Sequence, residues 1–220
     1  MNNIAIDGPA GAGKSTIAKL LAKKLGCVYV DTGAMYRAMA LYLIRQGIDG
    51  DDIEAIEKAV EDADITIDYV NGEQCVLLFD ENVNGLIRTE EVSAMASKSS
   101  ALAKVRRKLV ALQQEMAEHT SVVMDGRDIG TKVLPNAPVK IYLTADSAVR
   151  AKRRYDEMVQ KGVECDLEEI EKDIIERDHN DMTRAESPLV QAPDAILVDT
   201  SYMTIEEVAD RIMEIALEKF

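Results

Sequence analysis

Hydrophobic and polar positions follow two periods along this chain, and the periods predict strands and helices in turn. Residues 3–7 form a short apolar run suited to a buried strand, and apolar residues then recur at helical spacing from Ile17 to Leu25. The same pattern predicts four more core strands, at 27–30, 121–125, 139–143 and 195–198. Further helices are expected at about 33–46, 53–62, 89–101, 102–119, 147–161, 166–181 and 205–219. Alternation of this kind predicts an α/β fold, a doubly wound parallel sheet of five strands.

One segment interrupts the alternation. Residues 65–70 change to a period of two, Asn71-Gly72 is a strong hairpin signal, and 74–79 form a second run of strand type. A further turn is expected at 80–82. We therefore predict a small antiparallel insertion at about 64–87.

The turn after the first strand carries a phosphate-binding motif. Residues Gly8-Pro9-Ala10-Gly11-Ala12-Gly13-Lys14-Ser15 match G-x-x-x-x-G-K-[ST], with a strand before the motif and a helix after it. Backbone N–H groups at such a helix start converge on an anion. Lys14 would reach the β- and γ-phosphates of a nucleotide, and the Ser15 hydroxyl would ligate Mg²⁺. The alternative is a chance match in a glycine- and alanine-rich turn, which the strand and helix contexts disfavour.

Length and charge narrow the class of protein. A chain of 220 residues suits one α/β domain with insertions, and a net charge of −14 disfavours a binder of nucleic-acid polymers or anionic membranes. No apolar run is long enough to span a bilayer, and no signal peptide is visible. The three cysteines are far apart, which favours reduced thiols and a cytoplasmic location.

A small kinase is the class that remains. The guanine-reading tetrapeptide Asn-Lys-x-Asp of GTPase switches is absent, and helicases and motors are usually longer and more basic. A kinase that joins two anionic substrates needs cations in its cleft, because two unit charges 4 Å apart repel by about 1 kcal/mol even in water. Arginines beside turns and strand ends meet this need: Arg37, Arg127, Arg150, Arg153, Arg154, Arg177 and Arg184.

Four motifs together resemble the bacterial cytidylate kinases, from residue 3 to the last helix and in the family's order and spacing. They are Gly8–Thr16, Asp31-Thr32-Gly33-Ala34-Met35-Tyr36-Arg37, Asp125-Gly126-Arg127-Asp128-Ile129-Gly130-Thr131, and Glu176-Arg177-Asp178 with Asp181 and Arg184. The chain departs at Thr32, where many members carry serine, but the hydroxyl is kept. The resemblance implies a P-loop kinase fold over 1–220, with a monophosphate-binding region at about 31–101 and lid helices at about 147–181.

The resemblance also implies the substrates. ATP would bind at Gly8, Pro9, Ala10, Gly11, Ala12, Gly13, Lys14, Ser15 and Thr16. CMP, and dCMP as well, would be the acceptor. Its phosphate would lie between Arg37 and Arg127, whose planar guanidinium groups suit phosphate oxygens. The base would be read by Ser97, Arg106 and Asp128, with Thr32 and Arg184 nearby, and the ribose would contact Arg177 and Asp181.

The remaining implied roles concern the lid and the metal. Arg150, Arg153 and Arg154 would close on the ATP phosphates and, with Lys14, carry the catalytic charge. Mg²⁺ would be bound with ATP, held by Ser15 and with Asp125 or Asp31 in its outer shell. The family is expected to be monomeric.

Several of these residues have structural alternatives. Arg37 is also compatible with a surface arginine, the arginines at 150–154 with an ordinary basic helix, and Asp125 with a turn cap. Asp181 and Arg184 have the spacing of a helix-end salt bridge, and Asp128 could serve only to orient Arg127. Two other functions stay open: a small kinase for another acceptor, such as a uridylate, a shikimate-like compound or a nucleoside, and a nucleotide-binding regulator without turnover.

Overall fold

The computed structural model describes all residues, 1–220, and they form two compact units. Unit 1 comprises Met1–Cys27 and Ser121–Phe220, and unit 2 comprises Val28–Thr120. The predicted acceptor-binding region therefore falls within unit 2, and the predicted lid within unit 1. No helix has both the length and the apolar composition needed to cross a membrane.

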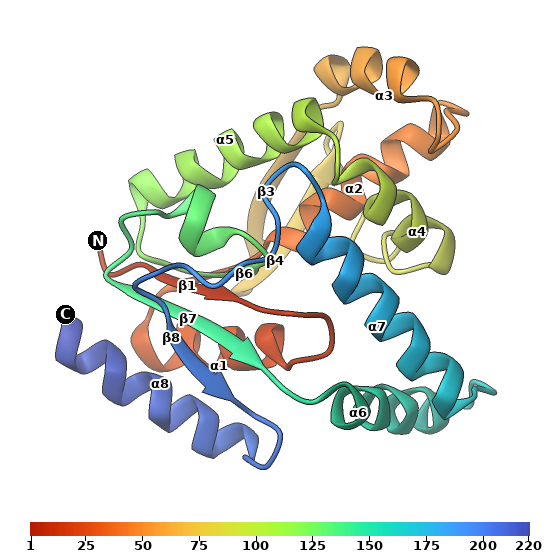
Figure 1. Ribbon diagram of the computed structural model, residues 1–220. Coiled ribbons are helices and arrows are strands. Elements are labelled where there is room, and N and C mark those ends of the chain that lie inside the picture. The colour runs from red at the N-terminus through yellow and green to blue at the C-terminus, as the bar shows by residue number, and fades with distance from the viewer. The chain divides into compact units, whose positions relative to one another are not determined.

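Unit 1 is built on parallel strands (Figure 1). Strand β1 (Ile4–Asp7) lies between β6 (Val122–Gly126) and β7 (Val139–Thr144), and β8 (Ile196–Asp199) pairs with the outer side of β7. The central strands β1 and β6 consist mainly of buried apolar residues, which is the pattern expected for a parallel sheet covered on both faces. With β2 (Val28–Asp31) the sheet has five strands, in the order β2-β6-β1-β7-β8.

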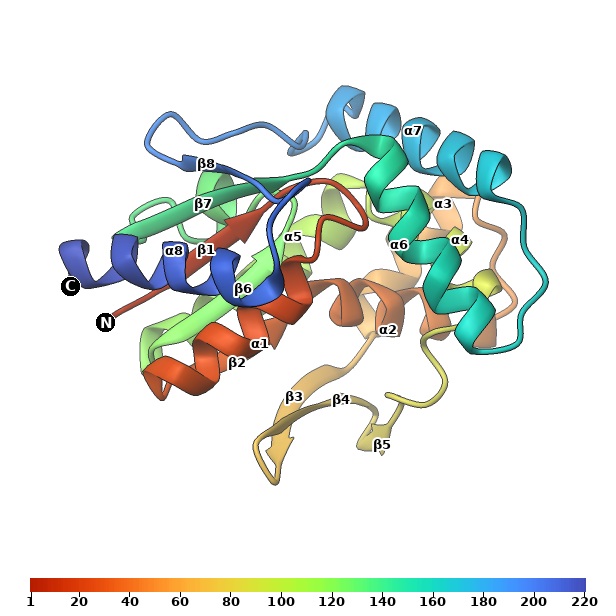
Figure 2. The same ribbon diagram turned by 90° about the horizontal axis from the view of Figure 1, so that it is seen from below.

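Four helices belong to unit 1. Helices α1 (Lys14–Leu25) and α8 (Ile205–Lys219) pack on one another, and a capping box at Thr204 and Glu207 fixes the start of α8. Helices α6 (Ser147–Gln160) and α7 (Leu167–Thr183) lie side by side (Figure 2) around a small apolar cluster. A single π-helical turn, Ile129–Val133, follows β6 and had no signal in the sequence pattern.

Unit 2 contains the antiparallel insertion. Its elements are β2, α2 (Thr32–Arg45), α3 (Ile53–Ala59), a 3₁₀ turn at Val60–Asp62, β3 (Ile65–Val70), β4 (Glu73–Leu78), β5 (Glu81–Asn82), α4 (Glu90–Ser99) and α5 (Ala103–His119). Strands β3, β4 and β5 form a separate antiparallel sheet, joined by the predicted hairpin at Asn71-Gly72. The turn expected at 80–82 lies at Phe79-Asp80 instead, where φ is positive, and β5 follows it.

The predicted fold class is confirmed: a five-stranded parallel sheet with flanking helices and a small separate antiparallel sheet. The predicted helix at 53–62 divides into α3 and the 3₁₀ turn. The other predicted elements are present with ends that differ by a few residues.

Candidate active site

The phosphate-binding motif forms the turn between β1 and α1, and its shape depends on glycine. A Cβ on Gly8 would lie 1.9 Å from the backbone oxygen of Leu143 on β7, and φ at Gly8 is +150°. Gly13 has a φ of +88° and stands immediately before the first residue of α1. Any residue with a Cβ would clash with β7 at position 8 and would be strained by the positive φ at position 13, so the loop requires glycine at both positions.

The N-terminus of α1 is arranged to receive an anion. Five helices are capped by the side chains of Asp31, Asp52, Thr89, Asp166 and Thr204, whereas α1, like the helices that begin at Ala103 and Ser147, has no side-chain cap and no acidic residue in its first turn; α1 alone of these follows the phosphate-binding motif. The N–H groups of a helix's first turn have no partners within the helix, and the dipole adds positive potential there. A phosphate group is the ligand that satisfies both conditions.

Lys14 is buried at this point, with an exposed fraction of 6%, and its Nζ donates to the backbone oxygen of Pro9 at 2.7 Å. Burial and the nearby positive charge of Arg127 lower the pKa of Lys14 to about 7, against the opposing effect of Asp125, Asp7 and Asp181. A phosphate beside the ammonium would favour its charged form. Lys14 is therefore a cation whose charge responds to the arrival of an anion.

Ser15 and Asp125 lie together, as a metal site requires. The Ser15 hydroxyl on α1 donates to Oδ2 of Asp125, the buried carboxylate near the end of β6, at 3.0 Å. No group of three or more histidine, cysteine, aspartate or glutamate side chains could hold a metal by itself. The pair supplies hard oxygen atoms of the kind that Mg²⁺ takes from proteins when phosphates provide the rest of its shell.

The end of β6 carries the next predicted site residues beside the phosphate loop. Strands β1 and β6 are parallel neighbours, with Asp7 opposite Gly126, so both end at the same edge of the sheet. Arg127 and Asp128 follow directly, and Asp128 is buried. In open α/β sheets, ligands bind at the carboxyl ends of the strands.

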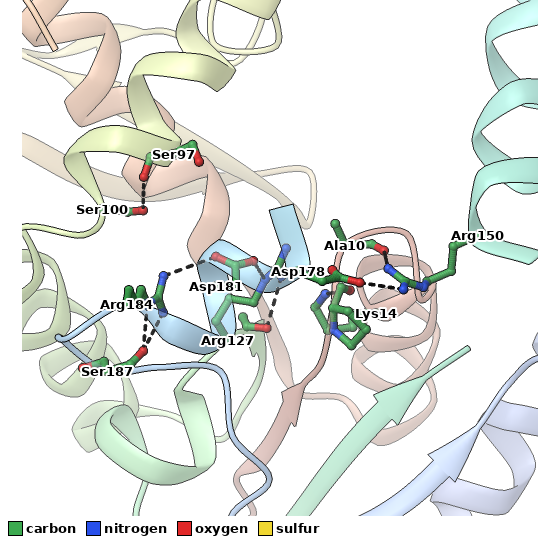
Figure 3. Close-up of polar contacts among 12 residues, drawn as sticks. Ala10, Lys14, Ser97, Ser100, Arg127, Arg150, Asp178, Asp181, Arg184 and Ser187 are labelled. Carbon is green, nitrogen blue, oxygen red and sulfur yellow. Dashed lines mark hydrogen bonds and ion pairs between the residues drawn. The ribbon is translucent and has the colours of Figure 1, made fainter. Parts of the chain in front are cut away.

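Asp181 on α7 joins two of the predicted arginines (Figure 3). Its Oδ2 accepts from Nε of Arg127 at 2.7 Å, and its Oδ1 accepts from Nη1 of Arg184 at 3.4 Å. Burial alone would raise the pKa of Asp181, but Arg127, Arg184 and Arg177 hold it below its usual value. The predicted helix-end pair of Asp181 and Arg184 is thus present, and Arg127, 54 residues away in the chain, shares the same carboxylate.

The three predicted lid arginines have three different surroundings. Arg150 is buried and donates to Ala10 O of the phosphate loop at 2.8 Å and to Oδ2 of Asp178 at 2.6 Å (Figure 3). It also donates to Ala145 O at 2.8 Å. Arg153 donates to the backbone oxygen of Thr200 at 2.6 Å. Arg154 is exposed. Arg150 is thus buried, Arg153 is half-buried and Arg154 is exposed, so the three arginines do not form one equivalent set.

In unit 2, the segment from β2 into α2 positions Asp31, Thr32 and Arg37. Asp31 caps α2 through the N–H of Ala34 at 3.0 Å, and its other oxygen contacts Arg88 at 3.1 Å. Thr32 is buried. The guanidinium of Arg37 lies back over the first turn of α2, 3.6 Å from where a Cβ on Gly33 would be. The carboxylate of Asp31 thus has two partners within unit 2.

Ser97 and Arg106 lie on α4 and α5 of unit 2. Ser97 is exposed, and its backbone oxygen accepts from the Ser100 hydroxyl at 3.1 Å. Arg106 is only 4% exposed, with Nη1 donating to Ser100 O at 3.0 Å and its guanidinium 5.3 Å from the ring centre of Tyr36. Arg106 is therefore a fixed, buried cation, whereas its sequence neighbour Arg107 is exposed.

The family model described as cytidylate kinase matches residues 4–218. The chain belongs to the cytidylate kinase family. It is 52% identical over 213 residues to the cytidylate kinase of Caldicellulosiruptor saccharolyticus, covering 97% of this chain and 94% of that protein. It is 50% identical over 216 residues to the cytidylate kinase of Ligilactobacillus salivarius, covering 98% and 96%.

Solved structures with low sequence identity share the fold of this cytidylate kinase family member. A gluconokinase from Sinorhizobium meliloti 1021 is 14% identical, with a TM-score of 0.51 over 99% of this chain and 92% of that one. A shikimate kinase from Bacteroides thetaiotaomicron is 15% identical, with a TM-score of 0.50 over 98% of both chains. These likenesses bear on the fold alone. The evidence that the chain is a kinase that phosphorylates CMP is its membership of the cytidylate kinase family.

Two buried carboxylates of this cytidylate kinase were missed by sequence reasoning. Asp178 pairs with Arg150, and Asp7 accepts the backbone N–H groups of Ile129 and Gly130, each at 2.7 Å. A signal for Asp7 was present: it is the one charged residue in an otherwise apolar buried strand. Asp178 stands in the Glu176-Arg177-Asp178 motif, but no local pattern indicated its pairing with Arg150, 28 residues away in the chain.

Proposed function

We propose that this kinase transfers the γ-phosphoryl group of ATP to CMP, and also to dCMP, in a direct, Mg²⁺-dependent in-line reaction that yields ADP and the diphosphate. The observation that carries the proposal is the position of Arg127, which follows β6 beside the end of β1, where the phosphate loop begins, and whose side chain is held by Asp181. A cation for the donor and a cation for the acceptor thus share one edge of the β1–β6 pair.

On the donor side, the phosphate loop would bind ATP through its backbone N–H groups and the start of α1. Lys14 would stabilise the charge that develops on the transferring group. Arg150 is proposed to act through the loop itself, because its guanidinium donates to Ala10, Ala145 and Asp178. Arg154, which is exposed on α6, is the arginine best able to reach the phosphates when α6 and α7 move.

Ser15 and Asp125 fit a magnesium ion, since their oxygens lie 3.0 Å apart and one of them is a buried carboxylate. Bound Mg²⁺ would neutralise charge on the β- and γ-phosphates. Asp125 is the better candidate for the outer shell, because both oxygens of Asp31 have partners within unit 2. Asp125 would also hold the Ser15 hydroxyl in place.

On the acceptor side, we propose that Arg37 and Arg127 bind the phosphate of CMP. Asp181 favours this role for Arg127, because it fixes the Nε side of the guanidinium. Asp128, Arg106 and Ser97 are proposed to read cytosine, with Thr32 and Arg184 close to the nucleotide. Burial of Asp128 and Arg106 supports this role, because a buried polar group discriminates strongly against a base that leaves it unsatisfied. Asp181 and Arg177 are proposed to contact the ribose.

The chemistry then needs no covalent enzyme intermediate and no strong general base. The acceptor phosphate is already largely anionic at neutral pH, so the enzyme contributes position and electrostatic stabilisation. Closure of the α6–α7 pair would exclude water, which competes as phosphoryl acceptor.

Steady-state turnover with ATP against CMP, dCMP, UMP, AMP and cytidine tests the proposal. CMP and dCMP should be the preferred acceptors, and Lys14→Ala should lower kcat by about 100-fold or more without changing CMP affinity. Preference for cytidine would move the protein to the nucleoside kinases. ATP binding without turnover on any acceptor would favour the regulator instead.

A further inference from the structure

Asp7 is a buried carboxylate that the proposed chemistry leaves without a role. It ends β1 immediately before the phosphate loop and is 4% exposed. Its Oδ1 accepts the N–H of Ile129 and its Oδ2 accepts the N–H of Gly130, each at 2.7 Å. Both oxygens of one side chain are therefore bound to adjacent backbone groups 122 and 123 residues away along the chain.

The two N–H groups open the π-helical turn that follows Asp128. The first N–H groups of a helical turn lack partners within it, and the residue before the turn usually supplies a side-chain acceptor. Asp128 occupies that position but forms no side-chain cap. Asp7 takes over the capping from the neighbouring strand, so the carboxylate of Asp128 is not used to hold its own turn.

We infer that Asp7 is a positioning residue for CMP: by capping the turn at Ile129 and Gly130, it fixes the Arg127-Asp128 segment against the end of β1. The inference rests on the proposed acceptor roles of Arg127 and Asp128. Through its two hydrogen bonds Asp7 would link β1, which leads into the proposed ATP-binding loop, to the Arg127-Asp128 segment. It would do so without touching either substrate.

The arrangement is specific to a carboxylate and to glycine. Two N–H donors need two acceptor oxygens, and an asparagine would offer its NH₂ to one of them. On the other side, a Cβ on Gly130 would lie 3.2 Å from Oδ2 of Asp7 and 3.3 Å from Cδ of Lys140. A methyl group there would press on the same pairing while leaving the charge of Asp7 unchanged.

Asp7→Asn and Gly130→Ala therefore test the inference from both sides. Each should raise the KM for CMP, by about tenfold for Asp7→Asn and less for Gly130→Ala, while the KM for ATP stays within about twofold. Ile212→Val, in the buried face of α8, is the control for a mild loss of stability away from the site. Thermal unfolding of all three variants accompanies the kinetics.

Four outcomes would overturn the inference. If Asp7→Asn raises the KM for ATP while Gly130→Ala has no effect, Asp7 acts by its charge on Lys14. If both variants change only the melting temperature, as Ile212→Val should, the contact is merely structural. Arg127→Ala separates the two proposals: an unchanged KM for CMP there would overturn both, whereas a raised KM there with a normal KM in Asp7→Asn would overturn the role of Asp7 alone.

Discussion

Binding of ATP should draw a proton from solution, because the pKa of Lys14 without bound phosphate lies close to neutral pH. Burial and the charge of Arg127 lower the pKa of Lys14 from 10.5 to about 7. A shift of this size means that the charged form costs about 5 kcal/mol more in the folded site than in water. Bound phosphates would reverse that cost, because an opposite charge a few ångströms away favours the ammonium.

The number of protons taken up follows from the pKa. Near pH 8 only about a tenth of the free enzyme would carry a charged Lys14, so uptake should approach about 0.9 proton per ATP. Near pH 6 most molecules are already charged, and uptake on this account should fall to about 0.1. Calorimetric titration of ATP with magnesium in two buffers of different ionisation enthalpy, Tris and HEPES, measures the uptake directly.

Lys14→Arg is the matched control, because a guanidinium stays charged throughout this pH range and its uptake should vanish wherever ATP still binds. Heats for the wild type that are the same in both buffers near pH 8 would refute the reasoning. Protein stability gives an independent sign check. A lysine with a depressed folded pKa adds stability that is present above about pH 10.4 and is lost as pH falls through about 7. Lys14→Met should remove that dependence.

Three further predictions concern the arginines and the base. Arg37→Ala and Arg127→Ala should each weaken the binding of CMP by about 1.5–3 kcal/mol and leave the affinity for ATP nearly unchanged. Equilibrium titrations with each nucleotide measure both affinities, and an unchanged affinity for CMP would show that its phosphate binds elsewhere. Arg154→Ala should lower kcat more than it raises the KM for CMP, without changing the melting temperature. Arg150→Ala should lower both kcat and the melting temperature, because three buried hydrogen bonds are lost. Asp128→Ala should reduce kcat/KM for CMP far more than for UMP, and an equal loss for both would leave Asp128 the lesser role of orienting Arg127.

The elements of secondary structure and the phosphate loop could be predicted from the sequence. Apolar periodicity located the five parallel strands and most helices, since burial of one face or of a whole strand leaves a direct pattern in the chain. The hairpin at Asn71-Gly72 was equally local, because a tight turn needs residues that tolerate positive φ. The motif around Lys14 was visible because its geometry depends on glycines at fixed spacing.

The contacts between residues far apart in the chain could not be predicted, because they depend on how the elements pack. Strand order is invisible in a local pattern, so the sequence could not show that β1 and β6 are neighbours and that Asp7 therefore reaches the turn at Ile129. The shared carboxylate of Asp181 and the buried bonds of Arg150 are likewise long-range pairings. Local spacing placed three arginines on one helix, but burial, which depends on what packs against that helix, gave each of them a different environment.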